Sequence, residues 1–178
     1  MRTTYKIRKL TRNDLISVFQ FYETTIPIAF HNEGLGHLTQ EIHREIEHKK
    51  TMLEYSLSIE NSDLFFLVAL EEEMILGAIS YGPPGNEIRQ CMDETLAGIN
   101  EIGSLYVLPK MQNQGIASDL IEAMKQELRR LGIDTFCLDS GYKHAQRKWL
   151  VKFGTPHKIV KDFWGKNQDH YIWIGKTG

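Results

Sequence analysis

The chain has 178 residues, of which 42% are hydrophobic and 25% are charged, and its formal net charge at pH 7 is −2. This length and composition are typical of one globular domain that buries a core without disulfides or a metal, so we expect a single domain over residues 1–178. The lack of a basic excess disfavours a nucleic-acid partner, and no apolar run reaches transmembrane length, so a membrane partner is not expected either.

The two cysteines, Cys91 and Cys137, indicate the redox compartment. Cys137 lies inside the apolar run 136–138, where a reduced and buried thiol is the simplest interpretation. Disulfide-poor chains are usual in the cytosol, so we expect a cytoplasmic protein.

The first sixty residues show the pattern of one strand and two helices. Tyr5–Leu10 alternates polar and apolar residues and is expected to form a strand. Capping residues then precede a helix that is expected to end near Thr24, followed by a loop over Ile26–Leu38. Thr39 can cap a second helix that continues to about Leu57.

The middle of the chain predicts a hairpin. Leu64–Leu70 is almost continuously apolar and Met74–Tyr81 supplies the returning strand. A Gly-Pro-Pro-Gly run ends that strand. Asn86–Asn100 is expected to be a loop with one helical turn near Met92–Leu96.

The next stretch predicts a strand, a polar loop, a glycine and a long helix. Ile102–Leu108 reads as the strand, Pro109 ends it, and Gly115 closes the loop. Gly132 stands at the expected C-terminal end of the helix. The helix shows apolar residues at three-and-four spacing: Leu120, Ile121, Met124, Leu128 and Leu131.

The last elements are a strand over Asp134–Asp139, a helix over His144–Phe153, and strands over Lys158–Phe163 and His170–Ile174. The predicted order is β-α-α-β-β-β-α-β-α-β-β. This pattern predicts an α/β fold with a mixed central sheet of about six to seven strands, flanked by about four helices on its two faces.

The loop before the long helix has the features of an anion site. A glycine lets a ligand approach the backbone, and the free N–H groups of a first helical turn attract phosphate. A Walker loop would need Lys-Ser or Lys-Thr after its second glycine, and a dinucleotide fingerprint would need three glycines. Neither pattern is present, and the actual frame, Gln112 to Ala117, is Q-x-x-G-x-A.

This frame, with the strand before it and the helix after it, resembles the GCN5-related N-acetyltransferase (GNAT) family, whose signature is Q/R-x-x-G-x-G/A. The resemblance implies an acetyl-CoA-dependent acyltransferase with this family's fold. It also implies that the backbone of the preceding strand, at Leu105, Tyr106 and Val107, holds the pantetheine arm. The pyrophosphate would be bound by Gln112, Asn113, Gln114, Gly115, Ile116, Ala117 and Ser118.

Acetyl transfer requires a neutral acceptor amine, and an alkyl amine has a pKa of about 10.4, so a base is needed. In several family members a glutamate at this place in the fourth strand is the base, which implies Glu101. The alternative interpretation of Glu101 is a strand-end carboxylate that faces water. An unpaired N–H near Val107 is a candidate donor to the developing oxyanion.

The family often carries a tyrosine as general acid in the following helix, but Leu150 occupies that position here. Tyr142 and Tyr171 are candidate substitutes, although packed aromatic residues are the commoner case. We therefore assign no general acid.

The expected function is transfer of an acetyl group from acetyl-CoA directly to a primary amine of a small molecule or peptide, with a homodimer allowed. The alternative is a non-catalytic acyl-CoA-binding or sensing module. No metal is expected. The carboxylates around the central strand either attract a cationic acceptor or serve solubility; they are Glu87, Asp93, Glu94 and Glu101.

Overall fold

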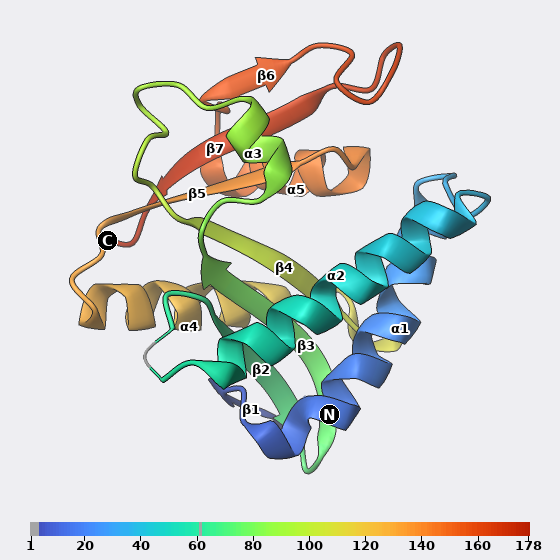
Figure 1. The fold of residues 1–178 in the computed structure, drawn as a ribbon, viewed down its shortest axis with the longest axis vertical. Coiled ribbons are helices and arrows are strands. Elements are labelled where there is room, and N and C mark those ends of the chain that lie inside the picture. The colour runs from blue at the N-terminus through green and yellow to red at the C-terminus, as the bar shows by residue number, and fades with distance from the viewer. Residues whose placement is uncertain (1–3, 61) are drawn as a thin grey trace.

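The fold is a seven-stranded mixed sheet with helices on both faces, as the sequence predicted (Figure 1). The computed structural model describes residues 4–60 and 62–178. The strand order is β1-β2-β3-β4-β5-β7-β6, and the neighbours are antiparallel except for β4 and β5, which are parallel. The strands are β1 (Lys6–Lys9), β2 (Phe65–Glu71), β3 (Met74–Gly82), β4 (Glu101–Val107), β5 (Thr135–Ser140), β6 (Lys158–Val160) and β7 (His170–Lys176).

Helices cover the sheet unequally. Figure 1 shows α1, α2 and α3 on one face and α4 and α5 on the other. The predicted element order is confirmed, with α3 as an additional helix between β3 and β4. The helices are α1 (Leu15–Asn32), α2 (Thr39–Ser58), α3 (Asn86–Gln90), α4 (Ile116–Arg130) and α5 (Lys143–Phe153), joined by 3₁₀ turns at Arg12–Asp14 and Pro109–Met111.

The alternation of β2 explains why both faces are covered. Leu67 and Ala69 point into the core under α4, whereas Phe66 and Val68 point into the core under α1 and α2. All four side chains are at most 5% exposed. A strand that is apolar on both faces must be covered by helices on both sides.

Helix α1 is longer than the sequence suggested. We expected a loop from Ile26, because Pro27 removes a backbone hydrogen bond and costs about 3 kcal/mol inside a helix. The helix continues to Asn32 instead. Ile26 and Phe30 lie one and two turns after buried Tyr22 and are themselves buried. Burying two such side chains stabilises by about 1.5–3 kcal/mol each, which outweighs the proline.

The helical turn expected near Met92–Leu96 occurs earlier in the chain, as α3. Fully buried Ile88 anchors α3 on the sheet, in a core that includes Cys137. After α3, the carboxylate of Asp93 accepts a hydrogen bond from the backbone N–H of Leu96 at 2.9 Å and forms a turn instead of a helix.

Strand β6 ends at Val160, three residues before the expected end at Phe163. The chain turns at Asp162, which has a φ of +53°. Its N–H donates to the carboxylate of Asp169 and its own carboxylate accepts from the N–H of Asn167, at 3.0 and 2.6 Å. These local bonds replace the ladder that a longer strand would need.

The centre of the sheet opens between β4 and β5. Within the described residues, the two strands pair at one position only, Glu101 with Cys137. On its other side, β4 has a bulge: Ala78 pairs with Tyr106 but Ser80 pairs with Gly103, so one extra residue lies between them. A bulge bends its strand, and β4 consequently diverges from β5 beyond Glu101.

The bulge is held from α1. Ser104 adopts a φ of +53°, and its carbonyl oxygen accepts a hydrogen bond from the hydroxyl of Tyr22 at 2.8 Å. Tyr22 is fully buried, and its ring contacts that of Tyr106 edge-on at 5.6 Å between centroids. Helix α1 therefore fixes the part of β4 that faces the opening.

We expect Tyr22→Phe to lower the free energy of unfolding by about 1–2 kcal/mol, because a bulge carbonyl loses its donor. Urea denaturation followed by circular dichroism measures this change. The control is Tyr55→Phe, since the Tyr55 side chain is 49% exposed and its loss of a hydroxyl should have little effect. Equal stabilities of the two variants would show that the Tyr22 hydroxyl does not hold the bulge.

Candidate functional site

The opening presents a backbone edge of β4 to the gap. The N–H of Leu108 donates to the carbonyl of Leu76 on β3 at 2.9 Å. Because alternate residues of a strand point their amides to opposite sides, the amides of Leu105 and Val107 point away from β3, toward β5. Tyr106, between them, pairs with Ala78. Of the three residues predicted to hold the pantetheine arm, Leu105 and Val107 thus have backbone groups that face the gap, whereas Tyr106 pairs with β3.

The loop after β4, residues 112–118, here called the cradle, has the backbone geometry that suits an anion. Gly115 precedes α4 with a φ of +93°, and Asn113 has a φ of +61°. The first hydrogen bond of the helix runs from the N–H of Asp119 to the carbonyl of Gly115 at 3.0 Å. The N–H groups of residues 116–118 precede that bond, and in a first helical turn such groups point outward with the positive end of the helix dipole.

Side chains of the loop bond back to the backbone. The amide of Gln112 donates to the carbonyl of Val107 at 3.3 Å, and the amide of Gln114 donates to the carbonyl of Lys110 at 3.1 Å. A Cβ placed on Gly115 would meet no described atom within 4 Å, so the space above this glycine is open. These features fit a diphosphate: free amides, a glycine with positive φ, and room for the ligand.

Glu101 stands where the gap begins. It is half-buried, and its Oε2 accepts a hydrogen bond from the N–H of Gly85 at 2.6 Å, so the side chain turns inward rather than into water. Burial, together with the nearby carboxylates of Asp139 and Glu87, raises the pKa of Glu101 to about 8. The Gly85 N–H and the ammonium of Lys49 oppose this shift.

The candidate acids differ in their positions. Tyr142 packs edge-on against Phe30, and its pKa is raised by burial and by the carboxylates of Glu45 and Glu33. Tyr171 packs with Trp173 in the core under α4 and α5, on the sheet face opposite Glu101. Leu150 is 41% exposed on α5. Of the two tyrosines, only Tyr142 belongs to the face that carries Glu101.

The four carboxylates that the sequence grouped together separate in space. Glu87 acts electrostatically on Glu101. Asp93 instead binds the ring of His157 at 3.0 Å, and Glu94 is exposed. The structure adds Asp139, a neighbour that sequence reasoning missed. The sequence contained a signal for it: Cys137 and Asp139 are two residues apart in a predicted strand, so their side chains share one face of the sheet.

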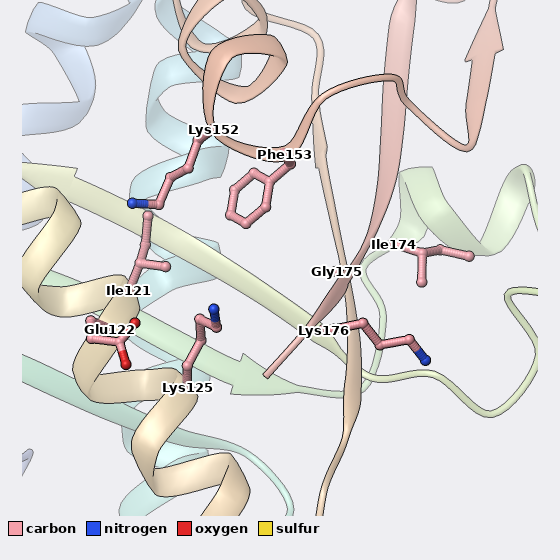
Figure 2. A pocket seen from close by; sticks show the side chains of 8 residues that line it. All are labelled: Ile121, Glu122, Lys125, Lys152, Phe153, Ile174, Gly175 and Lys176. Carbon is pink, nitrogen blue, oxygen red and sulfur yellow. The ribbon is translucent and has the colours of Figure 1, made fainter. Parts of the chain in front are cut away.

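A cavity of about 450 Å³ lies elsewhere on the α4 and α5 side of the sheet (Figure 2). Figure 2 shows Lys125 from α4 and Lys152 from α5 on its sides. Lys176 at the end of β7 donates to the hydroxyl of Thr135 at 2.9 Å. The cavity includes no residue of the loop 112–118, so it is separate from the cradle. Its lining is Ile121, Glu122, Lys125, Lys152, Phe153, Ile174, Gly175 and Lys176.

Two further findings concern the described residues 4–60 and 62–178. No three His, Cys, Asp or Glu side chains there gather into a group that could hold a metal ion. No helix in the same ranges combines the length and the apolar character that crossing a membrane requires.

Solved structures share this fold at low sequence identity. PaiA N-acetyltransferase from Thermoplasma acidophilum, in complex with coenzyme A, superposes with a TM-score of 0.65 at 17% identity, covering 97% of this chain and 99% of that one. The ribosomal-protein-S18-alanine N-acetyltransferase of Escherichia coli superposes with a TM-score of 0.65 at 13% identity, covering 98% of this chain and 95% of that one. The structure of yncA from Salmonella typhimurium with its cofactor acetyl-CoA superposes with a TM-score of 0.62 at 16% identity, covering 98% of this chain and 95% of that one.

No curated protein sequence matches the chain. The model of the acetyltransferase (GNAT) family matches residues 32–154, which contain the bulged strand, the glycine loop and the helices that follow it. That match covers more than half of the chain, and the resemblance drawn from the loop frame is confirmed: the protein belongs to the GNAT acetyltransferase family.

Proposed function

We propose that the protein transfers an acetyl group from acetyl-CoA directly to a primary amine of a small molecule or peptide. The observation that carries this proposal is that β4 and β5, within the described residues, pair only at Glu101 and Cys137. The two strands then diverge and leave the backbone edge of β4 facing a gap. Coenzyme A in the PaiA structure and acetyl-CoA in the yncA structure support the choice of donor.

In this proposal the loop 112–118 holds the pyrophosphate with backbone N–H groups. The edge of Leu105 and Val107 offers N–H and C=O groups to the amides of the pantetheine arm, as an added strand would use them. Acetyl-CoA supplies a thioester whose carbonyl carbon a neutral amine can attack. The chain itself must therefore neutralise the amine and exclude water.

Glu101 is the base in this proposal. A base works best when its pKa lies near the working pH, and a carboxylate raised to about 8 takes up a proton more readily than an ordinary glutamate. The Gly85 N–H orients Oε2 and leaves the other oxygen for the amine or for an intervening water. The acceptor reaches Glu101 from the face of α2 and α3, because Ile102 beside it points into the opposite core.

The alternative is a module that binds or senses acyl-CoA without catalysis, and Leu150 at the family's tyrosine position favours it. Free thiol release separates the two functions. With acetyl-CoA and a panel of primary amines, catalysis predicts thiol release that depends on the amine. Tight acetyl-CoA binding without amine-dependent release would support the sensing module instead.

We expect Glu101→Gln to lower turnover by about 10²–10⁴-fold with little change in acetyl-CoA affinity, because the glutamine retains the acceptor for Gly85 but cannot take a proton. Thiol-release assays measure the turnover, and calorimetry measures the affinity for acetyl-CoA. Glu94→Gln is the matched control, since Glu94 is exposed in the neighbouring loop. Unchanged turnover in Glu101→Gln would remove Glu101 from the mechanism.

The raised pKa of Glu101 predicts the direction in which kcat/KM changes with pH. The base must be ionised, so kcat/KM should fall as the pH drops through about 8, where Glu101 becomes protonated. An alkyl acceptor adds its own limb near its pKa of about 10.4. In Glu101→Gln only that second limb should remain. A wild-type profile without a limb near 8 would contradict the assignment.

We expect Gly115→Ala to weaken acetyl-CoA binding at least about tenfold, because a side chain is strained at a φ of +93° and would occupy the space above the amides. Gly132→Ala is the control: Gly132 has a φ of +74° at the other end of α4, also with nothing within 4 Å among the described atoms. Both variants should lose similar stability, and only the first should lose affinity by calorimetry. Equal affinities would show that the loop does not hold the donor.

A further inference from the structure

Three side chains form a hydrogen-bonded chain on the sheet face that carries Glu101. The indole N–H of Trp164 donates to Nδ1 of His170 at 3.1 Å. The Nε2 of His170 lies 2.9 Å from Oδ2 of Asp139. His170 is only 2% exposed, so its ring is enclosed by these contacts and by the ring of Phe163 at 4.9 Å between centroids.

The direction of the chain follows from its first member. An indole N–H can only donate, so Nδ1 of His170 must accept and carries no hydrogen. The hydrogen of the neutral imidazole is then on Nε2, and it is donated to Asp139. Trp164 in this way selects the tautomer of His170, and His170 holds one oxygen of Asp139 in a defined place.

The sheet brings Asp139 next to the base. Glu101 pairs with Cys137, and Asp139 is two residues farther along β5, so its side chain points to the same face as that of Cys137. At Asp139, β5 no longer pairs with β4. The Asp139 side chain is 20% exposed, whereas that of His170, which contacts it, is only 2% exposed.

Four groups act on Glu101 from the elements around it. Asp139 on β5 and Glu87 on α3 are negative, Lys49 on α2 is positive, and the N–H of Gly85 donates directly. After burial, Asp139 makes the largest contribution to the raised pKa of Glu101. Asp139 is the member of this set that the buried histidine and tryptophan position.

A glycine makes room for the chain. Any Cβ on Gly141 would clash with the indole ring of Trp164, at the atom that donates to His170. Gly141 follows β5 directly, two residues after Asp139. The backbone that carries Asp139 is thus packed against the far end of the same hydrogen-bonded chain.

We propose that Trp164 and His170 are positioning residues that hold the carboxylate of Asp139 beside Glu101, and that this second carboxylate makes Glu101 a stronger acceptor for the proton of the amine. The proposal rests on the proposed function for its catalytic meaning. Its electrostatic content concerns two carboxylates of this chain and can be measured without turnover.

The direct test is a titration of Glu101 in protein carrying ¹³C-labelled glutamate carboxyl carbons, with the signal identified by its loss in Glu101→Gln. In Asp139→Asn the side chain still accepts from His170 but loses its charge. We expect the midpoint of the Glu101 titration to fall by about one pH unit. Asp169→Asn is the control, since Asp169 precedes His170 but pairs with Lys161 at 2.7 Å, and it should not move the midpoint.

A pair of histidine variants tests the positioning. The side-chain amide in His170→Gln can still donate to Asp139, whereas the phenyl ring in His170→Phe cannot. We expect His170→Phe to shift the Glu101 midpoint in the same direction as Asp139→Asn, and His170→Gln to restore it toward wild type. Thermal melts check that each variant folds. A wild-type midpoint in folded Asp139→Asn overturns the proposal whatever the histidine variants do.

The pH profile of kcat/KM then separates this inference from the proposed function. If the limb that depends on Glu101 moves to lower pH in Asp139→Asn, together with the titration, both are supported. If the titration moves but no amine is acetylated, the proposed function fails and the electrostatic coupling stands. If amines are acetylated and neither the titration nor the limb moves, the coupling is overturned and the proposed function stands.

Discussion

The divergence of β4 from β5 is the constraint on which the rest of the structure depends. A parallel pair that continued beyond Glu101 and Cys137 would bury the N–H and C=O groups of Leu105 and Val107 in its own ladder. Because the pair stops, those groups face a gap. The carbonyl of Val107 accepts a hydrogen bond from the amide of Gln112 there, and the other groups need partners from a ligand or water. The cradle at Gly115 and the carboxylate of Glu101 lie at the two ends of this edge.

The element order and the cradle could be predicted from the sequence because their signals are local. The three-and-four spacing of Leu120, Ile121 and Met124 defines α4, and Gly115 just before it marks the loop. The features that the sequence did not predict depend on packing between residues that are far apart along the chain. Helix α1 passes through Pro27 because Phe30, farther along, finds a buried place that no local pattern reveals.

The environment of Glu101 could not be predicted from the sequence either, because it also depends on long-range packing. The groups that raise or lower its pKa come from α2, α3, the turn at Gly85 and β5, which are far apart along the chain. The sequence predicts that Asp139 ends a strand, but only the parallel pairing of Glu101 with Cys137 places that strand beside Glu101. The proposed cofactor-binding residues could therefore be predicted from a motif, whereas the surroundings of the proposed base depend on tertiary structure.

The bulge at Ser104 also determines on which face of the sheet Glu101, the proposed base, lies. Tyr106 points toward α1 and α2, and strict alternation over the five positions back to Glu101 would turn Glu101 toward α4. The extra residue reverses that parity. Ile102 and Leu105, three apart, consequently share the α4 core, and Glu101 emerges on the opposite face. One inserted residue thus places the carboxylate of Glu101 on the sheet face opposite α4, the helix whose first turn forms the cradle.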